Sequence, residues 1–375
     1  MNIQFNRHEW AGAFGDMGTD FPLIVGMILA AHLDVTSVLV MYGMMQILTG
    51  LVYQRPMPVQ PLKAVAALVI TQKIAGPTIM GAGVAIAMVM LMLTLTGSLT
   101  WLGKAVPKAV VRGIQLGLGM SLAALALKDY IGKDGMSGYI LAFVSFILVL
   151  WLLPHKRFPA ALAVILLGII YSLFFRIHVG ELTAGFGFHV PFVRFPNSHD
   201  IITGFLLLAL PQIPLSLGNS ILATHQVNKD LFPDKPLSIR KIGGTYSLMN
   251  FISPLFGGIP VCHGSGGMMG HYTFGARTGG SILIYGSMYL TVGLFFSGAF
   301  NKIVQIFPLP ILGVILFIES LALMTLVRDL GEDKADLWIA FMVGAMSCSL
   351  PYGFVIGMLA GMLCCWLKQR KMLVA

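Results

Sequence analysis

Two short segments decide the fold of this chain: PMPVQPLKA, from Pro56 to Ala64, and GGIPVCHGSGG, from Gly257 to Gly267. Each places prolines, glycines and polar residues inside a hydrophobic background, and each contains the pair Pro-Val. Irregular backbone that faces lipid leaves N–H and C=O groups unpaired, at a cost of several kcal/mol per group. Such segments must therefore be buried in protein or line a cavity, and a matching pair of them points to a binding site.

The rest of the chain has the composition of a membrane protein. Of its 375 residues, 57% are hydrophobic and only 10% are charged, and the mean hydropathy is +0.85. A soluble domain carries roughly 25% charged residues. Apolar stretches of about 17 to 25 residues, the length that spans a bilayer, recur from end to end. The sequence therefore predicts an all-α polytopic membrane protein with no soluble domain.

The N-terminal segment and the cysteines exclude other classes. Arg7 and His8 lead into WAGAFGDMGTDFPLIVGMILAA, which lacks the smooth apolar core of a cleavable signal peptide and predicts a first membrane helix. All cysteines lie in apolar segments without disulfide or metal-ligand spacing: Cys262, Cys348, Cys364 and Cys365. We expect no metal, no cofactor and no enzymatic activity, since no nucleophile and base stand together.

Apolar runs between helix breakers predict fourteen membrane segments. They cover residues 10–31, 36–54, 58–74, 78–98, 105–127, 137–153, 158–176, 201–225, 240–256, 261–276, 279–299, 303–327, 335–349 and 351–368. The third and the tenth contain the two broken segments.

The distribution of lysine and arginine predicts how these segments are oriented. With a cytoplasmic N-terminus, seventeen of the 24 basic residues face the inner side, six face the outer side, and Lys63 lies within a segment. This asymmetry follows the positive-inside rule and predicts an even number of segments, with both termini on the cytoplasmic side of the inner (plasma) membrane. The basic loops then face anionic lipid, which explains the net charge of +9 without nucleic-acid binding.

Three landmarks recur at nearly the same offset along the chain and suggest an internal repeat. The offset is 202 for Pro58 and Pro260, and 203 for the pairs Gly15 and Gly218, and Pro107 and Pro310. Duplication of seven segments, an odd number, predicts two halves (1–200 and 201–375) of inverted topology in the membrane. The alternative is chance, because prolines and glycines are frequent in this chain.

An inverted repeat predicts that the third and tenth segments enter the membrane from opposite sides. If each begins as extended backbone and turns helical at mid-membrane, two helix N-termini face one cavity and offer free N–H donors. Pro61 suits a first helical turn, where its missing N–H is no loss. Gly264 and Ser265 leave backbone donors unobstructed at the other turn. Each N-terminus carries roughly half a positive charge, so we expect an anion between them.

The motifs at these positions resemble a known family. The strings AFGDMGTDFPL, PMPVQPLKAVAA, LPQIPLSLGNSILAT and LFPDKP are similar to those of the molybdate transporter family, distant relatives of the SulP sulfate permeases. The resemblance implies the seven-plus-seven inverted-repeat fold that SulP and nucleobase permeases share. In that fold a core domain (segments 1–4 and 8–11) moves against a gate domain (segments 5–7 and 12–14). It also implies molybdate uptake, with no cytoplasmic regulatory domain.

These features favour a secondary active oxyanion importer that works by alternating access. No ATP-binding GxxxxGK[ST] string occurs in the chain. A dianion that enters against a negative-inside potential costs about 2.3 kcal/mol per charge for each 100 mV. Uptake therefore needs a driving gradient, and proton symport is the simplest. The alternatives are sulfate or another anion on the same fold, a nucleobase, and an anion channel.

The first half of the chain supplies several polar candidates. Gln60 can donate its amide to an oxyanion or satisfy the broken backbone. Lys63 is a functional candidate by its depth in the membrane. It binds the anion, pairs structurally with Asp16 or Asp20, or extends its ammonium group to the membrane interface. These two acids lie one turn apart, can share a helix face and have Thr19 between them. They are candidates for proton coupling, for an ion pair that holds Lys63 in place, or for capping a broken helix. Asp20 favours the structural role.

The second half supplies a smaller set. Gln212 and Asn219 are seven residues apart and share one helix face, for lining a cavity or for interhelical hydrogen bonds. His263, beside Gly264 and Ser265 at the tenth-segment turn, binds an anion or senses pH when protonated, or is a neutral, backbone-bonded histidine.

Glu319 is the only acid well inside the twelfth segment, where it either faces the core domain and accepts a proton or is buried against Ser320. The expected partners are molybdate or a related oxyanion, protons and membrane lipid, and the sequence also allows a homodimer. The expected substrate-binding residues are Gln60, Pro61, Lys63, Gln212, Asn219, His263, Gly264 and Ser265. The expected coupling or structural polar residues are Asp16, Thr19, Asp20 and Glu319.

Overall fold

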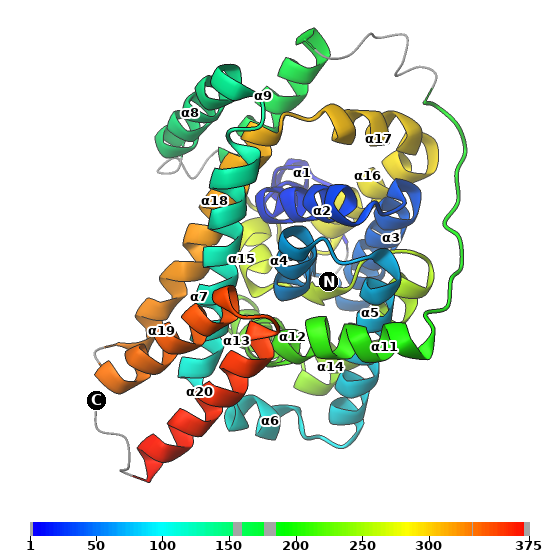
Figure 1. Cartoon of the computed structure of the whole chain (residues 1–375). Coiled ribbons are helices and arrows are strands. Elements are labelled where there is room, and N and C mark those ends of the chain that lie inside the picture. The colour runs from blue at the N-terminus through cyan, green and yellow to red at the C-terminus, as the bar shows by residue number, and fades with distance from the viewer. Residues whose placement is uncertain (1–2, 153–159, 176–184, 332, 371–375) are drawn as a thin grey trace.

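The computed structural model describes residues 3–152, 160–175, 185–331 and 333–370, and Figure 1 shows that this part is almost entirely helical. The elements of the first half are α1 Arg7–Ala13, α2 Met17–Ala31, α3 Val35–Tyr53, β1 Val59–Pro61, α4 Lys63–Gln72, α5 Gly76–Leu95, α6 Leu99–Ala105, α7 Lys108–Leu125, η1 Ala126–Tyr130, α8 Gly135–Leu152 and α9 Ala160–Phe175. Those of the second half are α11 Ser198–Gly204, η2 Phe205–Ala209, α12 Leu210–Leu215, η3 Ser216–Leu222, α13 Ala223–Leu231, α14 Ile239–Leu255, β2 Val261–His263, α15 Ser265–Thr273, α16 Gly280–Phe295, α17 Ser297–Ile306, α18 Leu309–Thr325, η4 Leu326–Leu330, α19 Lys334–Ser349 and α20 Gly353–Gln369.

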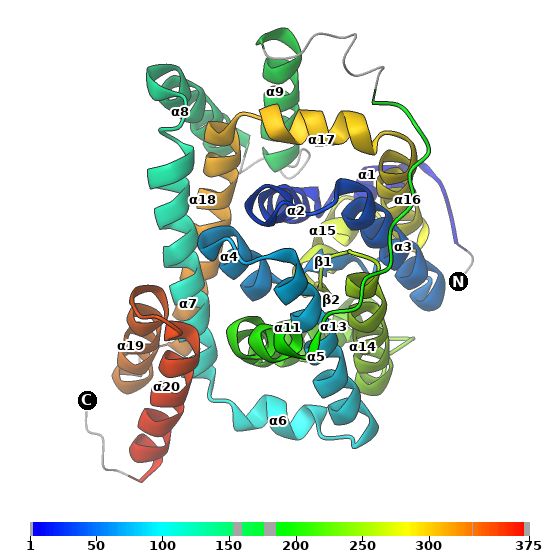
Figure 2. The same ribbon diagram turned by 45° about the vertical axis from the view of Figure 1, so that its right-hand side comes forward.

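The two broken segments meet in the middle of the molecule (Figure 2). Strand β1 pairs antiparallel with β2, and the register places Gln60 opposite Cys262. Helix α4 begins at Lys63, directly after β1, and helix α15 begins at Ser265, directly after β2. The prediction that both segments begin extended and then turn helical is confirmed.

The expected place of Pro61 in the first helical turn is wrong. Pro61 ends β1 opposite Val261, Leu62 is the N-cap, and α4 begins one residue later. The N–H of Leu62 donates to the carbonyl of Pro260 at 3.2 Å. Pairing with the other broken segment therefore keeps the backbone extended past the proline, an effect that the third segment alone does not reveal.

Several helices are long and apolar enough to cross a membrane. In the described part of the chain there are six, or up to eight if each of two bent pairs is one span. These pairs are α1 with α2, bent by 41°, and α16 with α17, bent by 96°. Shorter apolar helices cover residues 63–72, 162–172 and 353–369. The count of fourteen segments and the inverted repeat stay predictions.

The first and the eighth predicted segments differ from the observed helices. The first is broken between α1 and α2, where the backbone of Gly15 packs against the backbone of Gly270 with no room for a Cβ. The eighth is longer than expected, from residue 198 to 231, and contains two π-helical stretches, η2 and η3. Pro211 and Pro214 lie between these stretches, and a proline cannot donate to the regular helical ladder.

The boundary between the eleventh and twelfth predicted segments also differs. Residues 303–306 belong to α17, which turns sharply away from α16. Helix α18 begins only at Leu309, with Pro308 as its N-cap. Proline fixes its own backbone angle and restricts the residue before it to extended conformations, so it separates the two helices.

The helices form two groups, which Figures 1 and 2 show on either side of the centre. In the α7–α18 group, α7 packs against α18, α19 and α20, and α18 packs against α8. In the α4–α15 group, α3 packs against α16, α5 against α14 and α11, and α2 against α4. The groups touch where α4 meets α7 and where α2 meets α18. Their movement as gate and core domains stays a prediction.

The loop that carries LFPDKP is held by the buried Arg55. Its guanidinium donates to the Oδ1 of Asn228 at 3.0 Å and to the carbonyl of Lys235 at 2.7 Å. It also lies 5.4 Å from the ring centre of Phe232. Arg55 thus ties the end of α3 to the loop between α13 and α14, which gives this motif a structural role.

The buried carboxylate of Glu9 caps helix α16. Its Oε1 accepts from the backbone N–H groups of Arg277 and Thr278 at 2.9 and 2.8 Å, and its Oε2 accepts from that of Ser281 at 2.9 Å. The first turn of a helix has N–H groups without intrahelical partners and favours a negative charge. Glu9 therefore joins α1 to α16 on the side that carries the N-terminus.

Replacing Glu9 with alanine leaves these three N–H groups without their acceptor. We expect Glu9→Ala to destabilise the purified protein by at least about 1.5–3 kcal/mol, the contribution of a single hydrogen bond to a charged group. The midpoint of thermal unfolding in detergent measures this effect. Asp234→Asn, a change at an exposed acid of the α13–α14 loop, is the control and leaves the midpoint unchanged. Equal midpoints for both variants would contradict the capping role.

Candidate functional site

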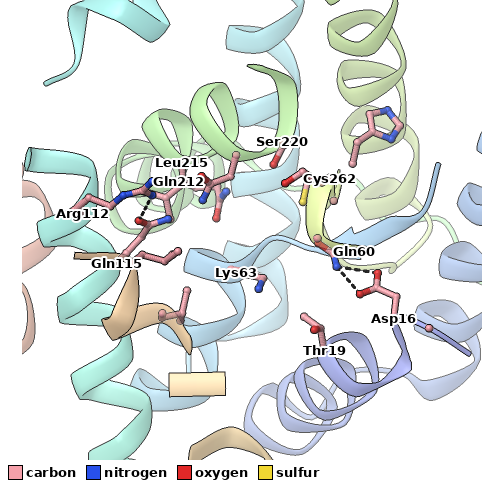
Figure 3. Close-up of a pocket in the computed structure, with 18 residues that line it drawn as sticks. Asp16, Thr19, Gln60, Lys63, Arg112, Gln115, Gln212, Leu215, Ser220 and Cys262 are labelled. Atoms are coloured by element: carbon pink, nitrogen blue, oxygen red, sulfur yellow. Dashed lines mark hydrogen bonds between the residues drawn. The ribbon is translucent and has the colours of Figure 1, made fainter. Parts of the chain in front are cut away.

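A cavity of about 370 Å³ lies beside the crossing of β1 and β2 (Figure 3). The α1–α2 break, the starts of α4 and α15, and helix turns of α12 and η3 line it, and α7 and the end of α18 close the other side. The predicted residues that line it are Asp16, Thr19, Gln60, Lys63, Gln212, Asn219, His263, Gly264 and Ser265. Pro61, Asp20 and Glu319 are not among the lining residues.

The start of α15 offers hydrogen-bond donors to this cavity. Within the described chain, no group accepts from the backbone N–H groups of Ser265, Gly266 and Gly267. Ser265 and Gly266 line the cavity. These donors and the positive end of the helix dipole favour an anion at this place.

Two glycines of this helix start lie against polar side chains. A Cβ on Gly264 would overlap the amide of Gln60, and a Cβ on Gly267 would overlap the carboxylate of Asp16. The sequence analysis took these glycines to leave the backbone open for a ligand. They also make room for two polar side chains of the first half of the chain.

The side chains of Asp16 and Gln60 are hydrogen-bonded to each other. The Nε2 of Gln60 donates to both carboxylate oxygens of Asp16, at 2.7 and 2.8 Å, and Figure 3 shows the pair at the rim of the cavity. The amide donor that Gln60 was expected to offer an oxyanion is therefore engaged in this state. Asp16 occupies the N-cap position of α2, but its side chain makes no capping bond there.

The start of α4 is occupied by a side chain from the eighth predicted segment. The Oε1 of Gln212 accepts from the N–H groups of Ala64 and Val65 at 2.9 and 3.3 Å, and its Nε2 donates to Ser216 at 3.0 Å. The expectation of free backbone donors at both helix starts is therefore wrong for α4. Gln212 completes the start of α4 with its oxygen, and Ser216 takes one of the two hydrogens of its NH₂ group.

Lys63 forms an ion pair with Glu319. Its Nζ lies 2.6 Å from the Oε1 of Glu319, and the two side chains are 33% and 14% exposed. The interpretation that Lys63 pairs with Asp16 or Asp20 is wrong, because its partner belongs to α18, in the twelfth predicted segment. Since α4 and α18 belong to different helix groups, this ion pair bridges the two.

Asp20 is fully buried and faces away from the cavity, toward Tyr42. The hydroxyl of Tyr42 contacts both the Oδ2 of Asp20 and, at 2.7 Å, the carbonyl of Val59. Asp20 and Tyr42 thus join α2 and α3 to β1, which agrees with the structural alternative.

His263 lines the cavity but directs its ring elsewhere. The ring is fully buried, its Nε2 lies 2.7 Å from the Oγ1 of Thr245, and it packs edge-on against Tyr53. Substrate binding by His263 therefore stays a prediction. In the described residues, no group of three or more His, Cys, Asp or Glu side chains is arranged to hold a metal ion.

Sequence reasoning missed Arg112 and Gln115 of α7, which line the side of the cavity opposite Gln60 (Figure 3). Arg112 lies inside the predicted segment 105–127, yet it was counted with the loop charges of the inner side. The signal was present, because an arginine within an apolar segment is a functional candidate in the same way as Lys63.

Comparison with protein families gives a match over residues 8–122 and 204–323 to the family described as molybdate transporter of the MFS superfamily. Molybdate transporter 1 of Arabidopsis thaliana is 31% identical to the chain, over 94% of this chain and 86% of that protein. Molybdate transporter 2 of the same plant is 32% identical, over 97% of this chain and 88% of that protein.

Two solved structures have the same fold. The transmembrane domain of the cyanobacterial bicarbonate transporter BicA superposes with a TM-score of 0.68, at 17% identity, over 97% of this chain and 98% of that domain. The murine Slc26a9 anion transporter in the inward-facing state gives 0.70, at 11% identity, over 99% of this chain and 69% of that protein. The predicted multi-pass helical membrane fold is thereby confirmed. Since both matched ranges include a broken segment and the two plant relatives align over most of their length, the chain belongs to the molybdate transporter family.

Proposed function

We propose that this chain imports molybdate, or a close tetrahedral oxyanion, by secondary active transport with alternating access and proton coupling. The observation that carries the proposal is that the first N–H groups of α15 have no acceptor among the described residues and lie at the same cavity as Lys63. The curated relatives are molybdate transporters by name, which supports this choice of anion.

The binding step follows from the donors that the cavity offers. An oxyanion only accepts hydrogen bonds. The N–H and the hydroxyl of Ser265 and the N–H of Gly266 are donors with no acceptor in the part of the chain that the structure describes. Lys63 adds the full positive charge that a helix dipole does not supply, and charge-assisted hydrogen bonds are about twice as strong as neutral ones. The dianion therefore binds between the start of α15 and the ammonium group of Lys63.

The coupling step follows from the Lys63–Glu319 ion pair. In the described state Glu319 holds the ammonium group that the oxyanion needs, so the two anions compete for Lys63. A proton on Glu319 removes this competition and brings one positive charge in with the dianion. Because Glu319 lies on α18 and Lys63 on α4, the same event releases a link between the two helix groups and allows them to move.

Uptake by the purified protein tests the proposal. In proteoliposomes, we expect saturable uptake of radiolabelled molybdate that excess tungstate blocks, and exchange against internal unlabelled molybdate. Stronger competition by sulfate than by tungstate would assign sulfate as the substrate. Uptake without saturation or exchange would indicate a channel and contradict the proposal.

A set of Lys63 variants separates anion binding from charge balance. Lys63→Gln leaves the partly buried carboxylate of Glu319 without its counter-ion, which destabilises the folded protein. The double variant Lys63→Gln/Glu319→Gln has no stranded charge and should fold, yet we expect at least about tenfold less uptake than in the wild type. Initial uptake rates, normalised to folded protein, measure this. Wild-type uptake by the double variant would show that Lys63 only neutralises Glu319.

Glu319→Gln tests the coupling by itself. The amide mimics a permanently protonated Glu319, so Lys63 is always available and no proton is needed. Wild-type uptake should rise as the outer side is acidified, whereas uptake by Glu319→Gln should stay constant across the same pH series. Asp336→Asn, at an acid near the α19 start, is the control and should keep the wild-type profile. Unchanged pH dependence in Glu319→Gln would overturn this route of coupling.

A further inference from the structure

Helix α7 contributes a polar pair to the cavity that the proposed transport step does not use. Arg112 and Gln115 lie one turn apart on α7 and line the cavity from the side opposite Gln60 and Lys63 (Figure 3). Gln115 is fully buried. The side chain of Arg112 is only 14% exposed.

The hydrogen bonds of this pair fix which way the amide faces. The Nη1 of Arg112 donates to the Oε1 of Gln115 at 2.8 Å. A guanidinium group has donors only, so the oxygen of Gln115 must face Arg112 and its NH₂ group must face away from it. The other end of the guanidinium pairs with the carboxylate of Asp329.

Two donors are left without a partner by this arrangement. The Nε of Arg112 and the Nε2 of Gln115 are buried and make no hydrogen bond within the described chain. An unmade hydrogen bond on a buried donor costs about 1–3 kcal/mol. An occupied state of the cavity that supplies acceptors to both donors would recover this cost.

The electrostatics favour an anion as that partner. Arg112 carries a full charge, and its counter-ion Asp329 is 48% exposed, so solvent weakens the compensation. A tetrahedral oxyanion has several acceptor oxygens and no donors, which matches a set made of donors alone. A single water would satisfy one or two donors but would leave the charge unmatched.

We propose that Arg112 and Gln115 form a second oxyanion subsite on α7, distinct from the one at Lys63 and the start of α15. It takes the same class of tetrahedral dianion and rests on the proposed function. Because Arg112 falls on the predicted cytoplasmic side of its segment, the subsite receives the anion between Lys63 and the inner mouth of the cavity. Each protein molecule then holds two oxyanions when saturated.

Tungstate makes the subsite directly visible, because its heavy atom scatters X-rays anomalously. In crystals of the wild-type protein soaked with tungstate, we expect two anomalous peaks, one near Ser265 and Lys63 and one within hydrogen-bond distance of Gln115. Calorimetric titration should give two tungstates per chain. Gln115→Leu should lose the α7 peak, keep the other and reduce the stoichiometry from two to one.

A second variant and a surface control complete the test. The double variant Arg112→Gln/Asp329→Asn removes the charge of Arg112 together with that of its counter-ion, so no unpaired charge remains. It should also lose only the α7 peak. Gln305→Leu, at an exposed glutamine of α17, should keep both peaks. One peak near Lys63 with normal uptake would overturn the subsite and leave the proposed function intact. Absence of both peaks together with absence of uptake would overturn both.

Discussion

The backbone pairing of β1 with β2 is the constraint on which the rest of this structure depends. Two segments about 200 residues apart in the chain are extended, and thus lack helical hydrogen bonds, at the centre of an apolar molecule. Each supplies hydrogen-bond partners for the backbone N–H and C=O groups of the other. Without this pairing, both would leave polar backbone unsatisfied at a depth where water cannot compensate. The pairing also sets where α4 and α15 begin, and hence where the helix dipoles point.

The polar side chains around this crossing are distributed so that most charges and donors have a partner. Gln60 is hydrogen-bonded to Asp16, Gln212 accepts from the first N–H groups of α4, and Glu319 forms an ion pair with Lys63. In the described part of the chain, the N–H groups at the start of α15 and the donors of Arg112 and Gln115 have no such partner. These open donors are the basis of the proposal that the cavity binds an anion despite its acidic neighbours.

The parts of this arrangement that could be predicted from sequence are those that local chemistry decides. Prolines and glycines within apolar runs located both broken segments, and most of the predicted polar residues line the cavity. The parts that could not be predicted depend on which segments pack together. The partner of Lys63 lies 256 residues away on α18, and no spacing along the chain indicates it. Pro61 was misplaced because strand pairing, not its own preference, determines where α4 begins.

Arg112 illustrates a different limit. Charge counting assigned it to a loop because it lies near the end of a predicted segment, where the sequence does not decide between lipid headgroups and a cavity. Gln212 lines the cavity as expected, but its bonds to Ala64 and Val65 depend on how α12 packs beside the start of α4. Such contacts follow from the fold and not from periodicity.

The affinity of Ser265 variants for molybdate tests the central claim, that the α15 N-terminus binds the oxyanion, most directly. Gly264 has extended backbone angles (φ −103°, ψ 114°), which suit the residue before a proline, and proline is tolerated at a first helical position. Ser265→Pro and Ser265→Ala both remove the hydroxyl, but only proline removes the N–H. We predict a dissociation constant at least about tenfold higher for Ser265→Pro than for Ser265→Ala, as loss of one charge-assisted hydrogen bond implies. Equal constants in two well-folded variants would contradict the account.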